Sequence, residues 1–514
     1  MSVHHHRGRL GTGHALTWQE ERRDEGDSDQ HGGHDERSGE RRRTPVQPLR
    51  GDLRGGLTGR DELAAHASRG EPRRNSGALT AALVGLVTVV ALETMSVAAI
   101  LPLVTDELGR IDLYGWVYSG LALGQIVGIV VAGRWADRAN PSRPLVAGLA
   151  LYVVGLSIAA LAPSMVLLVA GRVVQGFGAG AVPSVVYVCV GRGFSEAERP
   201  RIFAMMSTAW VVPSLIGPVL ASLVAESVGW RWVFAGVIPV AVVFGVVGRR
   251  EILRLDASPN DGQSVDAVAL GAMVVGTGVA LGGFQARSGW LAAAMVIGGG
   301  AAALVAFRRL TPAGTLRVRP GLPAVVAVRG LLTAAFFAGD GFVSLAVVEL
   351  RSTSTTFAGA VVASGSLTWT LGSWLQARLM AEVGARRLVG AGIALIAVGY
   401  PMFGVAAESD GWRGLMFVGP LVAGFGMGLA YAPLSAASLS QCEPGREGAA
   451  TSALQLSDVT GVTVGTGLAG VLLASDVWDG SLGAGLAAVW SFATAVAVLG
   501  VIGSRGLPGP RTVG

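Results

Sequence analysis

Two carboxylates stand alone inside long apolar segments of this chain, and their type and spacing suggest chemistry. Glu93 and Asp340 lie 247 residues apart, within the apolar segments 78–104 and 325–348. An ionised carboxylate at the centre of a bilayer costs at least about 2.5–3.5 kcal/mol. A chain that places an acid twice at the same point of a repeated unit is predicted to use it. Reversible proton binding is the chemistry that such an acid offers.

The other titratable residues narrow this chemistry further. All seven His lie within the first 66 residues, and all 40 basic residues are Arg, so proton transfer inside the apolar segments must use carboxylates. A third acid, Asp458, falls on one helical face with Thr451, Gln455 and Gly465. The two Cys are too few for a disulfide framework or a metal site. We therefore predict no metal, no cofactor and no enzyme activity.

The elements that must position these acids are membrane-spanning helices. Hydrophobic residues make up 51% of the chain, and the mean hydropathy is +0.53, which is typical of a polytopic membrane protein. The sequence predicts fourteen spans, centred near Val90, Leu123, Gly155, Ala179, Ser214, Val240, Gly276, Gly298, Phe337, Ser366, Ala397, Phe425, Val462 and Val496. The spans around Gly276 and Gly298 are short and rich in Gly, and without them twelve would remain.

Arginine placement predicts the orientation. Alternate loops, starting after the second span, together with the C-terminal tail carry 19 Arg, whereas the opposite loops carry 5. Because cytoplasmic loops of membrane proteins are enriched in positive charge, the first set and both termini are predicted to be cytoplasmic. We expect a multi-pass protein of the cell (plasma) membrane, the inner membrane where there are two.

Residues 1–76 differ from the rest. They hold 14 Arg and 13 acids without an apolar run, which predicts a disordered cytoplasmic tail and argues against a nucleic-acid partner. An alternative is that the true start codon lies downstream. The triplet His4-His5-His6 offers at most weak metal binding.

The chain also contains an internal repeat. The segment 172–180, with glycines at 176, 178 and 180, reappears at 420–428, and the loop 133–143 has a weaker echo at 377–387. Two symmetric six-helix halves with a cavity between them are common in secondary transporters. We predict an all-α membrane protein with the following parts: tail 1–76, first bundle 77–248, linker 249–323 with two extra transmembrane helices, second bundle 324–504 and tail 505–514.

The loop after the second span resembles the signature loop of the major facilitator superfamily, and the chain from about 78 to 503 resembles its fourteen-spanner drug:proton antiporters. The matching residues are Gly133, Asp137, Arg138 and Arg143, with Asn140 where Gly is usual. The resemblance implies the major facilitator fold and a gating role for this loop. Ordinary positive-inside charge would explain the arginines but not the acid.

Three further motifs carry the resemblance. Arg172 and Gln175 match a motif in which an intramembrane Arg is linked to proton transfer, although Arg172 could be a structural tie. Pro213, Gly217 and Pro218 are similar to the antiporter motif, although a kinked packing helix would look the same. The acid-to-proline spacing of Glu93 and Pro102 matches the first span of this family, which implies proton coupling at Glu93. We extend that role to Asp340 and Asp458. Each of these acids could instead be a protonated packing residue.

Together these features predict a proton-coupled antiporter that exports lipophilic, cationic small molecules, including drugs and antibiotics, by alternating access. The cargo meets an ionised acid in the central cavity, and protonation from outside releases it. Predicted pocket residues are Trp116, Tyr118, Gln125, Gln175, Trp210, Trp369, Trp374, Tyr431 and Gln455. Aromatic residues near helix ends are also typical of interface anchors.

Alternatives stay open on the same sequence. The cargo could be an endogenous metabolite, lipid or siderophore on the same fold. A membrane-bound enzyme would need a catalytic cluster at one face, and a sensor would not need acids in both halves. The expected partners are small molecules, protons and the bilayer, and the chain is expected to act as a monomer.

Overall fold

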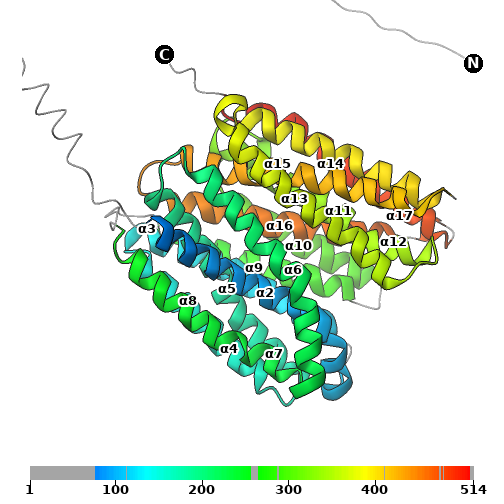
Figure 1. The fold of residues 1–514 in the computed structure, drawn as a ribbon, viewed down its shortest axis with the longest axis horizontal. Coiled ribbons are helices and arrows are strands. Elements are labelled where there is room, and N and C mark those ends of the chain that lie inside the picture. Colours follow the sequence, from blue (N-terminus) through cyan, green and yellow to red (C-terminus); the bar gives the residue numbers. More distant parts are fainter. Residues whose placement is uncertain are drawn as a thin grey trace, which may run out of the picture. The chain divides into compact units, whose positions relative to one another are not determined.

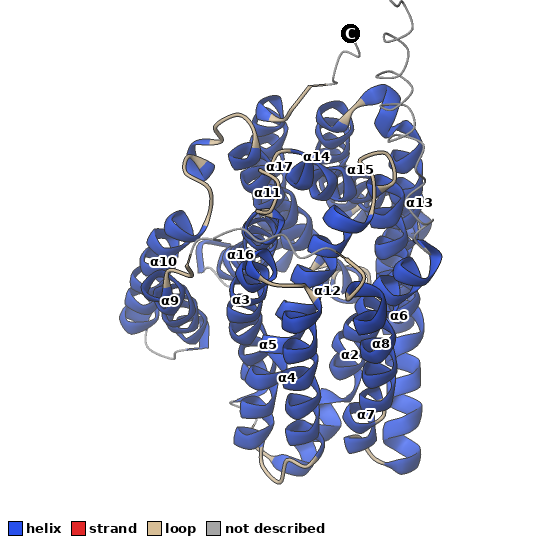
Figure 2. Cartoon of the chain, turned by 90° about the vertical axis from the view of Figure 1, so that its left-hand side faces the viewer, coloured by secondary structure: helices blue, strands red, loops and turns tan. Residues whose placement is uncertain are grey.

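The computed structural model describes residues 76–110, 113–255, 264–285, 289–409, 411–473, 476–478 and 480–509. The predicted N-terminal tail, apart from Ser76, lies outside the described residues, as does the end of the C-terminal tail. The described residues form helices joined by short loops, with no strand among them (Figure 2).

The helices of the first half precede the linker. They are α2 (Ser76–Leu108), α3 (Tyr114–Arg138), α4 (Ser142–Ala160), α5 (Met165–Gly193), α6 (Arg199–Val228), α7 (Arg231–Ala235) and α8 (Val237–Ile252). The linker contributes α9 (Ala267–Gln285) and α10 (Gly289–Leu310). The second half consists of α11 (Leu322–Asp340), α12 (Val343–Glu349), α13 (Thr355–Val383), α14 (Ala385–Glu408), α15 (Val418–Ser440), α16 (Glu447–Leu473) and α17 (Leu482–Gly503). Figure 1 shows the two halves as neighbouring groups of helices, blue to green and yellow-green to red.

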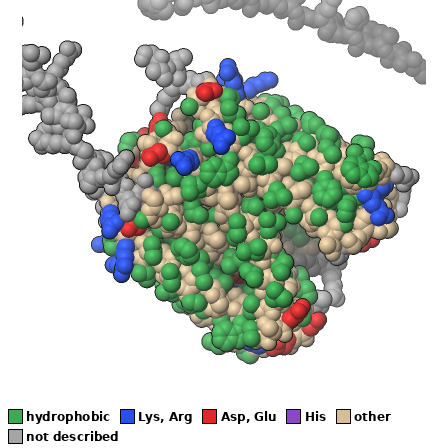
Figure 3. Space-filling view, viewed as in Figure 1, with side chains coloured by type: hydrophobic (Ala, Val, Ile, Leu, Met, Phe, Trp, Pro, Cys, Tyr) green, Lys and Arg blue, Asp and Glu red, His purple; other side chains and the backbone are tan. Residues whose placement is uncertain are grey.

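Each predicted span centre lies within one of these helices. Thirteen described segments are long and apolar enough to cross a membrane. α13, which contains Ser366, is 29 residues long but is not among the thirteen, because its sequence is rich in Ser, Thr and Gly. Hydrophobic side chains cover much of the face in Figure 3, as a lipid-facing surface requires.

Local sequence explains where several helices begin and end. Ser164, Ser354 and Ser481 cap the N-termini of α5, α13 and α17 by accepting a hydrogen bond from the backbone three residues on. Gly229 and Gly384 follow α6 and α13 with φ of 101° and 81°, where a side chain would be strained. The capped ends fall at the predicted loops.

The repeated glycines bring helix backbones into direct contact. A Cβ atom on Gly176 of α5 would overlap the carbonyl oxygen of Leu121 on α3, and one on Gly424 of α15 would overlap that of Gly365 on α13. Small residues permit such approach between membrane helices. Each copy of the repeated motif therefore allows two helices of its own half to pack closely.

The two extra helices form a hairpin set beside α3 and α16 (Figure 2). A small apolar cluster joins them to both halves. Its buried members are Ile126 and Val130 of α3, Leu456 of α16, Ala269, Leu270 and Met273 of α9, and Ala306, Phe307 and Leu310 at the end of α10. The pair predicted around Gly276 and Gly298 is thus helical and packed against the bundle.

Candidate functional site

Glu93 and Arg172 form a buried ion pair between α2 and α5. Their side chains are 1% and 0% exposed, and Nη1 of Arg172 donates a hydrogen bond to Oε1 of Glu93. The same nitrogen donates to Oε1 of Gln175, 2.8 Å away. Nε donates to the carbonyl oxygen of Val117 on α3 at 3.3 Å. The structure therefore brings together two predicted coupling residues and one predicted pocket residue.

One oxygen of this carboxylate has no protein donor. Oε2 of Glu93 is buried and accepts no hydrogen bond from any residue that the structure describes. An ionised carboxylate can accept about four hydrogen bonds, so this oxygen has capacity for a proton. Because Glu93 is 1% exposed, it does not face an open cavity in this conformation. The predicted direct meeting of cargo and Glu93 would need a rearrangement.

A second buried cluster lies in the other half and centres on Arg329 of α11. Nε of Arg329 donates to Oδ1 of Asp458 on α16 at 2.9 Å, and the two side chains are 0% and 20% exposed. Nη1 donates to the carbonyl oxygen of Tyr431 at 2.8 Å and to Oγ of Ser435 at 3.2 Å. The hydroxyl of Tyr431 donates to Oδ2 of Asp458 at 2.8 Å. The guanidinium carbon lies 3.1 Å from the centre of the Tyr431 ring, a cation–π contact.

Sequence reasoning missed Arg329. It is a single Arg within the apolar segment 322–349, whereas the predicted intramembrane charges are Glu93, Asp340, Asp458 and Arg172. An unpaired Arg in a bilayer is as costly as an acid. The same criterion applied to basic residues would have found it, and its partner Asp458 was already predicted.

Asp340, the predicted counterpart of Glu93, has a different setting. It is the last residue of α11 and is followed by a break at Gly341 and Phe342 before α12. No described side chain forms an ion pair with its carboxylate. In the second half the acid paired with a buried Arg is Asp458. The sequence repeat therefore places Asp340 at the position equivalent to Glu93 without giving it an equivalent partner.

Asp137 of the signature loop joins the two halves. Its side chain is 3% exposed. Oδ1 accepts a hydrogen bond from the amide of Gly448 at 2.7 Å, and Oδ2 accepts one from Ala449 at 2.8 Å. These amides open α16, where the helix dipole favours an anion. Arg192 of α5 lies 3.7 Å from Asp137 and 3.3 Å from Glu447. We call these groups the latch.

Other bonds between the halves lie at the same end of the bundle. Oγ of Ser452 donates to the carbonyl oxygen of Ile129 at 2.8 Å. Nε2 of Gln376 donates to the carbonyl oxygen of Pro200 at 3.2 Å. A Cβ on Gly133 would overlap Ser452, so this glycine of the loop allows α3 and α16 to touch. We call this the arginine-rich end, because the predicted cytoplasmic loops gather there.

Comparison with known proteins agrees with this architecture. The family model of the Major Facilitator Superfamily matches residues 83–329. The human organic anion transporter MFSD10 superposes with a TM-score of 0.63 at 16% identity, covering 84% of this chain and 99% of that one. The proton:xylose symporter XylE superposes with a TM-score of 0.60 at 14% identity, covering 83% and 94%. This is the major facilitator fold.

Relatives in sequence include proteins named for multidrug efflux and for multidrug resistance. A Mycobacterium tuberculosis protein named a probable multidrug-efflux transporter is 26% identical over 440 residues, which is 82% of this chain and 92% of that protein. Multidrug resistance protein 3 of Bacillus subtilis is 22% identical over 399 residues, covering 74% and 76%. The match supports a transporter of the major facilitator type.

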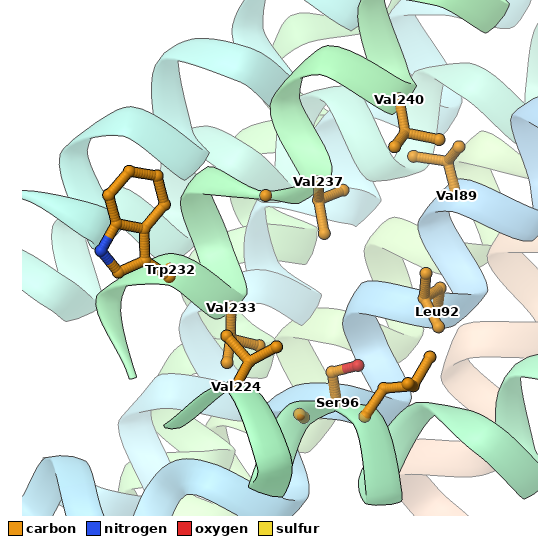
Figure 4. A pocket seen from close by; sticks show the side chains of 11 residues that line it. Val89, Leu92, Ser96, Val224, Trp232, Val233, Val237 and Val240 are labelled. Carbon is orange, nitrogen blue, oxygen red and sulfur yellow. The ribbon is translucent and has the colours of Figure 1, made fainter. Parts of the chain in front are cut away.

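The segment predicted to be an antiporter motif lies on α6 against α2. Gly217 is buried, and its carbonyl oxygen accepts a hydrogen bond from Oγ of Ser96 at 3.4 Å. Pro213 is buried as well, Pro218 is half-buried, and α6 continues through both prolines. Nearby, α2, α6, α7 and α8 line an open apolar pocket of about 210 Å³ (Figure 4), to which Leu92, Ser96 and Trp232 contribute. The motif thus fixes the α2–α6 contact of the major facilitator fold.

The predicted pocket residues divide into groups. Trp369 and Tyr431 have ring centres 5.6 Å apart, beside the Arg329 cluster. Gln455 is 7% exposed, one turn before Asp458, and Gln125 is half-buried. Tyr118, Trp210 and Trp374 are 36–40% exposed, and Nε1 of Trp374 donates to Thr208 on α6 at 3.0 Å. Trp116 lies beside Gly282 of α9. Trp369 and Tyr431 are therefore the strongest pocket candidates.

Proposed function

We propose that this chain is a proton-coupled antiporter of the major facilitator superfamily that exports lipophilic, cationic small molecules by alternating access. The observation that carries the proposal is a pair of buried acid–arginine clusters, Glu93–Arg172 and Asp458–Arg329, one in each half. Ionisable groups inside transmembrane helices are costly and mark ion or proton pathways. The relative named a probable multidrug-efflux transporter supports the outward direction of transport.

Proton binding at Glu93 would act through Arg172. In the described state the two charges compensate each other inside the protein. Protonation of Glu93 leaves the buried guanidinium without a counter-charge, and breaking a buried pair costs about 3–5 kcal/mol. A proton therefore destabilises this arrangement of α2 and α5 relative to another one. That difference is what couples proton binding to a change of conformation.

Cargo binding is assigned to the second cluster. Asp458 is 20% exposed, so a cation could approach its carboxylate more readily than that of Glu93. The aromatic faces of Trp369 and Tyr431 lie next to it and suit a flat or lipophilic cation. Arg329 would be the competing cation, and its release from Asp458 would accompany binding.

The latch indicates which state is described. Asp137, Arg192 and Glu447 hold the arginine-rich end shut. With the predicted orientation, this end faces the cytoplasm, so we infer that the described conformation is closed on the cytoplasmic side. In the proposed cycle, cargo release and proton loading take place while the cytoplasmic side is closed.

Transport by inside-out vesicles tests the proposal. We expect inside-out vesicles that contain wild-type protein and an acidic interior to accumulate a cationic dye. Glu93→Gln and Asp458→Asn should each abolish this accumulation. Both variants should still be expressed and be stable enough to purify. Asp340→Asn tests whether Asp340, the acid predicted as the counterpart of Glu93, is also needed. Undiminished proton-driven uptake in both Glu93→Gln and Asp458→Asn would refute the coupling role.

A further inference from the structure

A cavity of about 640 Å³ opens at the arginine-rich end, away from both acid–arginine clusters. It lies between the end of α3, the start of α4 and the end of α8. The lining residues are Trp135, Asn140, Ser142, Arg143, Val146, Ala147, Ala150, Arg249 and Leu253. They include two arginines and no acid.

The arginines of this cavity carry uncompensated charge. Arg143 and Arg249 are both exposed, and no described acid forms an ion pair with either of them. The nearest acids in sequence are engaged elsewhere, because Asp137 binds the start of α16 and Glu251 binds Arg254 at 2.8 Å. The potential inside the cavity is therefore positive, which favours an anion.

Asn140 holds the wall of the cavity in place. Its Nδ2 donates to the carbonyl oxygen of Leu255 at 2.8 Å, just past α8, and its Oδ1 accepts from the amide of Ser142 at 2.9 Å. The first bond ties the α3–α4 turn to the segment that follows α8, and the second fixes the turn itself. The distance between the two arginine-bearing elements is thus fixed before any ligand arrives, which lowers the entropy cost of binding.

The remaining lining is apolar and faces outward. Val146, Leu253 and Trp135 are 43%, 46% and 40% exposed, and Trp is a residue that favours the membrane–water interface. A ligand that fits must therefore have an anionic group at the arginines and hydrocarbon along α4. An inner-leaflet phospholipid with a net negative headgroup has this chemistry, and basic pockets between helix ends are known to hold such headgroups.

We propose that this cavity binds the headgroup of an anionic phospholipid, with Arg143 and Arg249 on the phosphate and the acyl chains along α4. Arg143 is also the last residue of the signature loop and the second residue of α4. An anionic lipid would therefore hold the α3–α4 turn next to the latch. The proposal uses the predicted orientation but does not depend on proton coupling or on the cargo.

Native mass spectrometry of the purified full chain tests it, with phosphatidylglycerol and phosphatidylcholine offered in equal amounts. We expect wild-type protein to retain phosphatidylglycerol preferentially, and Arg143→Gln/Arg249→Gln to bind it about tenfold more weakly. Arg250→Gln is the matched control, since Arg250 is exposed, adjacent and outside the lining. Arg143→Lys/Arg249→Lys keeps the charge and should retain most binding, which preserves the test if the Gln variant is unstable.

Two outcomes would overturn the proposal. One is equal phosphatidylglycerol retention by wild type, the double Gln variant and Arg250→Gln, which would mean that binding is elsewhere. The other is an equal rise in thermal midpoint with inorganic phosphate alone, which would mean a site for a free anion rather than a lipid. Neither measurement involves transport, so it stays separate from the test of the antiport function.

Discussion

The carboxylate of Asp137 and the amide of Gly448 are joined by a 2.7 Å hydrogen bond, although the two residues lie 311 positions apart and in different halves. Together with the bond to Ala449 at 2.8 Å, it attaches the signature loop to the first turn of α16. The loop thus contacts the opposite half through backbone groups, and this contact can form only while the arginine-rich end is closed.

Asp137→Asn should weaken the latch. It removes the charge from two charge-assisted hydrogen bonds and the attraction to Arg192, each such bond contributing about 1.5–3 kcal/mol. We expect the equilibrium to shift toward opening of the arginine-rich end by tenfold or more. Spin-label distances across that end should report the shift.

Glu443→Gln serves as the control for this experiment, because Glu443 is exposed at the same end and forms an ion pair with Arg446, three residues on, at 2.9 Å. An Asp137→Asn distance distribution identical to that of Glu443→Gln would contradict the latch.

Arg329→Gln should destabilise the second half. It leaves Asp458 and the Tyr431 hydroxyl in a partly buried site without their cation, at a cost of about 3–5 kcal/mol. We expect a lower thermal midpoint and no cation transport. Arg329→Gln/Asp458→Asn should recover part of the midpoint but not the transport. If the thermal midpoint of the double variant falls by the sum of the decreases in Arg329→Gln and Asp458→Asn, the two side chains do not interact.

The effects of Glu93→Gln and Arg172→Gln on the free energy of unfolding should not be additive. Either change alone leaves one buried group uncompensated, whereas the double change leaves two neutral amides that can bond to each other. A double-mutant cycle on thermal unfolding should give a coupling energy of about 1–3 kcal/mol. Additive effects within about 0.5 kcal/mol would contradict the pairing of these side chains.

Gly424→Ala should impair folding, because the added Cβ would overlap the carbonyl oxygen of Gly365 and force α13 and α15 apart. Overpacking of this kind costs about 1–3 kcal/mol or more. Gly300→Ala is the control, since nothing lies within 4 Å of a Cβ there. Yield of monodisperse protein measures the effect, and equal yields of the two variants would be inconsistent with the close packing.

Hydrophobic patterning was enough to predict the helices, because a bilayer forces each apolar stretch of 18 or more residues to satisfy its own backbone. It did not predict the break at Gly341–Phe342, which divides the span around Phe337 into α11 and α12. Nor did it reveal Arg329, since the spacing of the repeat directed attention to Asp340. The family motifs singled out both Glu93 and Arg172, which the structure pairs. The partners of Asp137, the amides of Gly448 and Ala449, lie in the other half of the chain. No local sequence pattern predicts this contact, because it depends on how the two halves pack against each other.

The hairpin of α9 and α10 makes the two flanks of the protein unequal. It packs on α3 of one half and α16 of the other, so it lies across the seam where those helices meet. The opposite seam, between α6 and α13, has no such cover among the described helices, and exposed Leu215, Leu371 and Trp374 border it. One flank of the protein is therefore covered by two additional apolar helices, while on the other flank α6 and α13 pack directly against each other, joined by the hydrogen bond from Trp374 to Thr208.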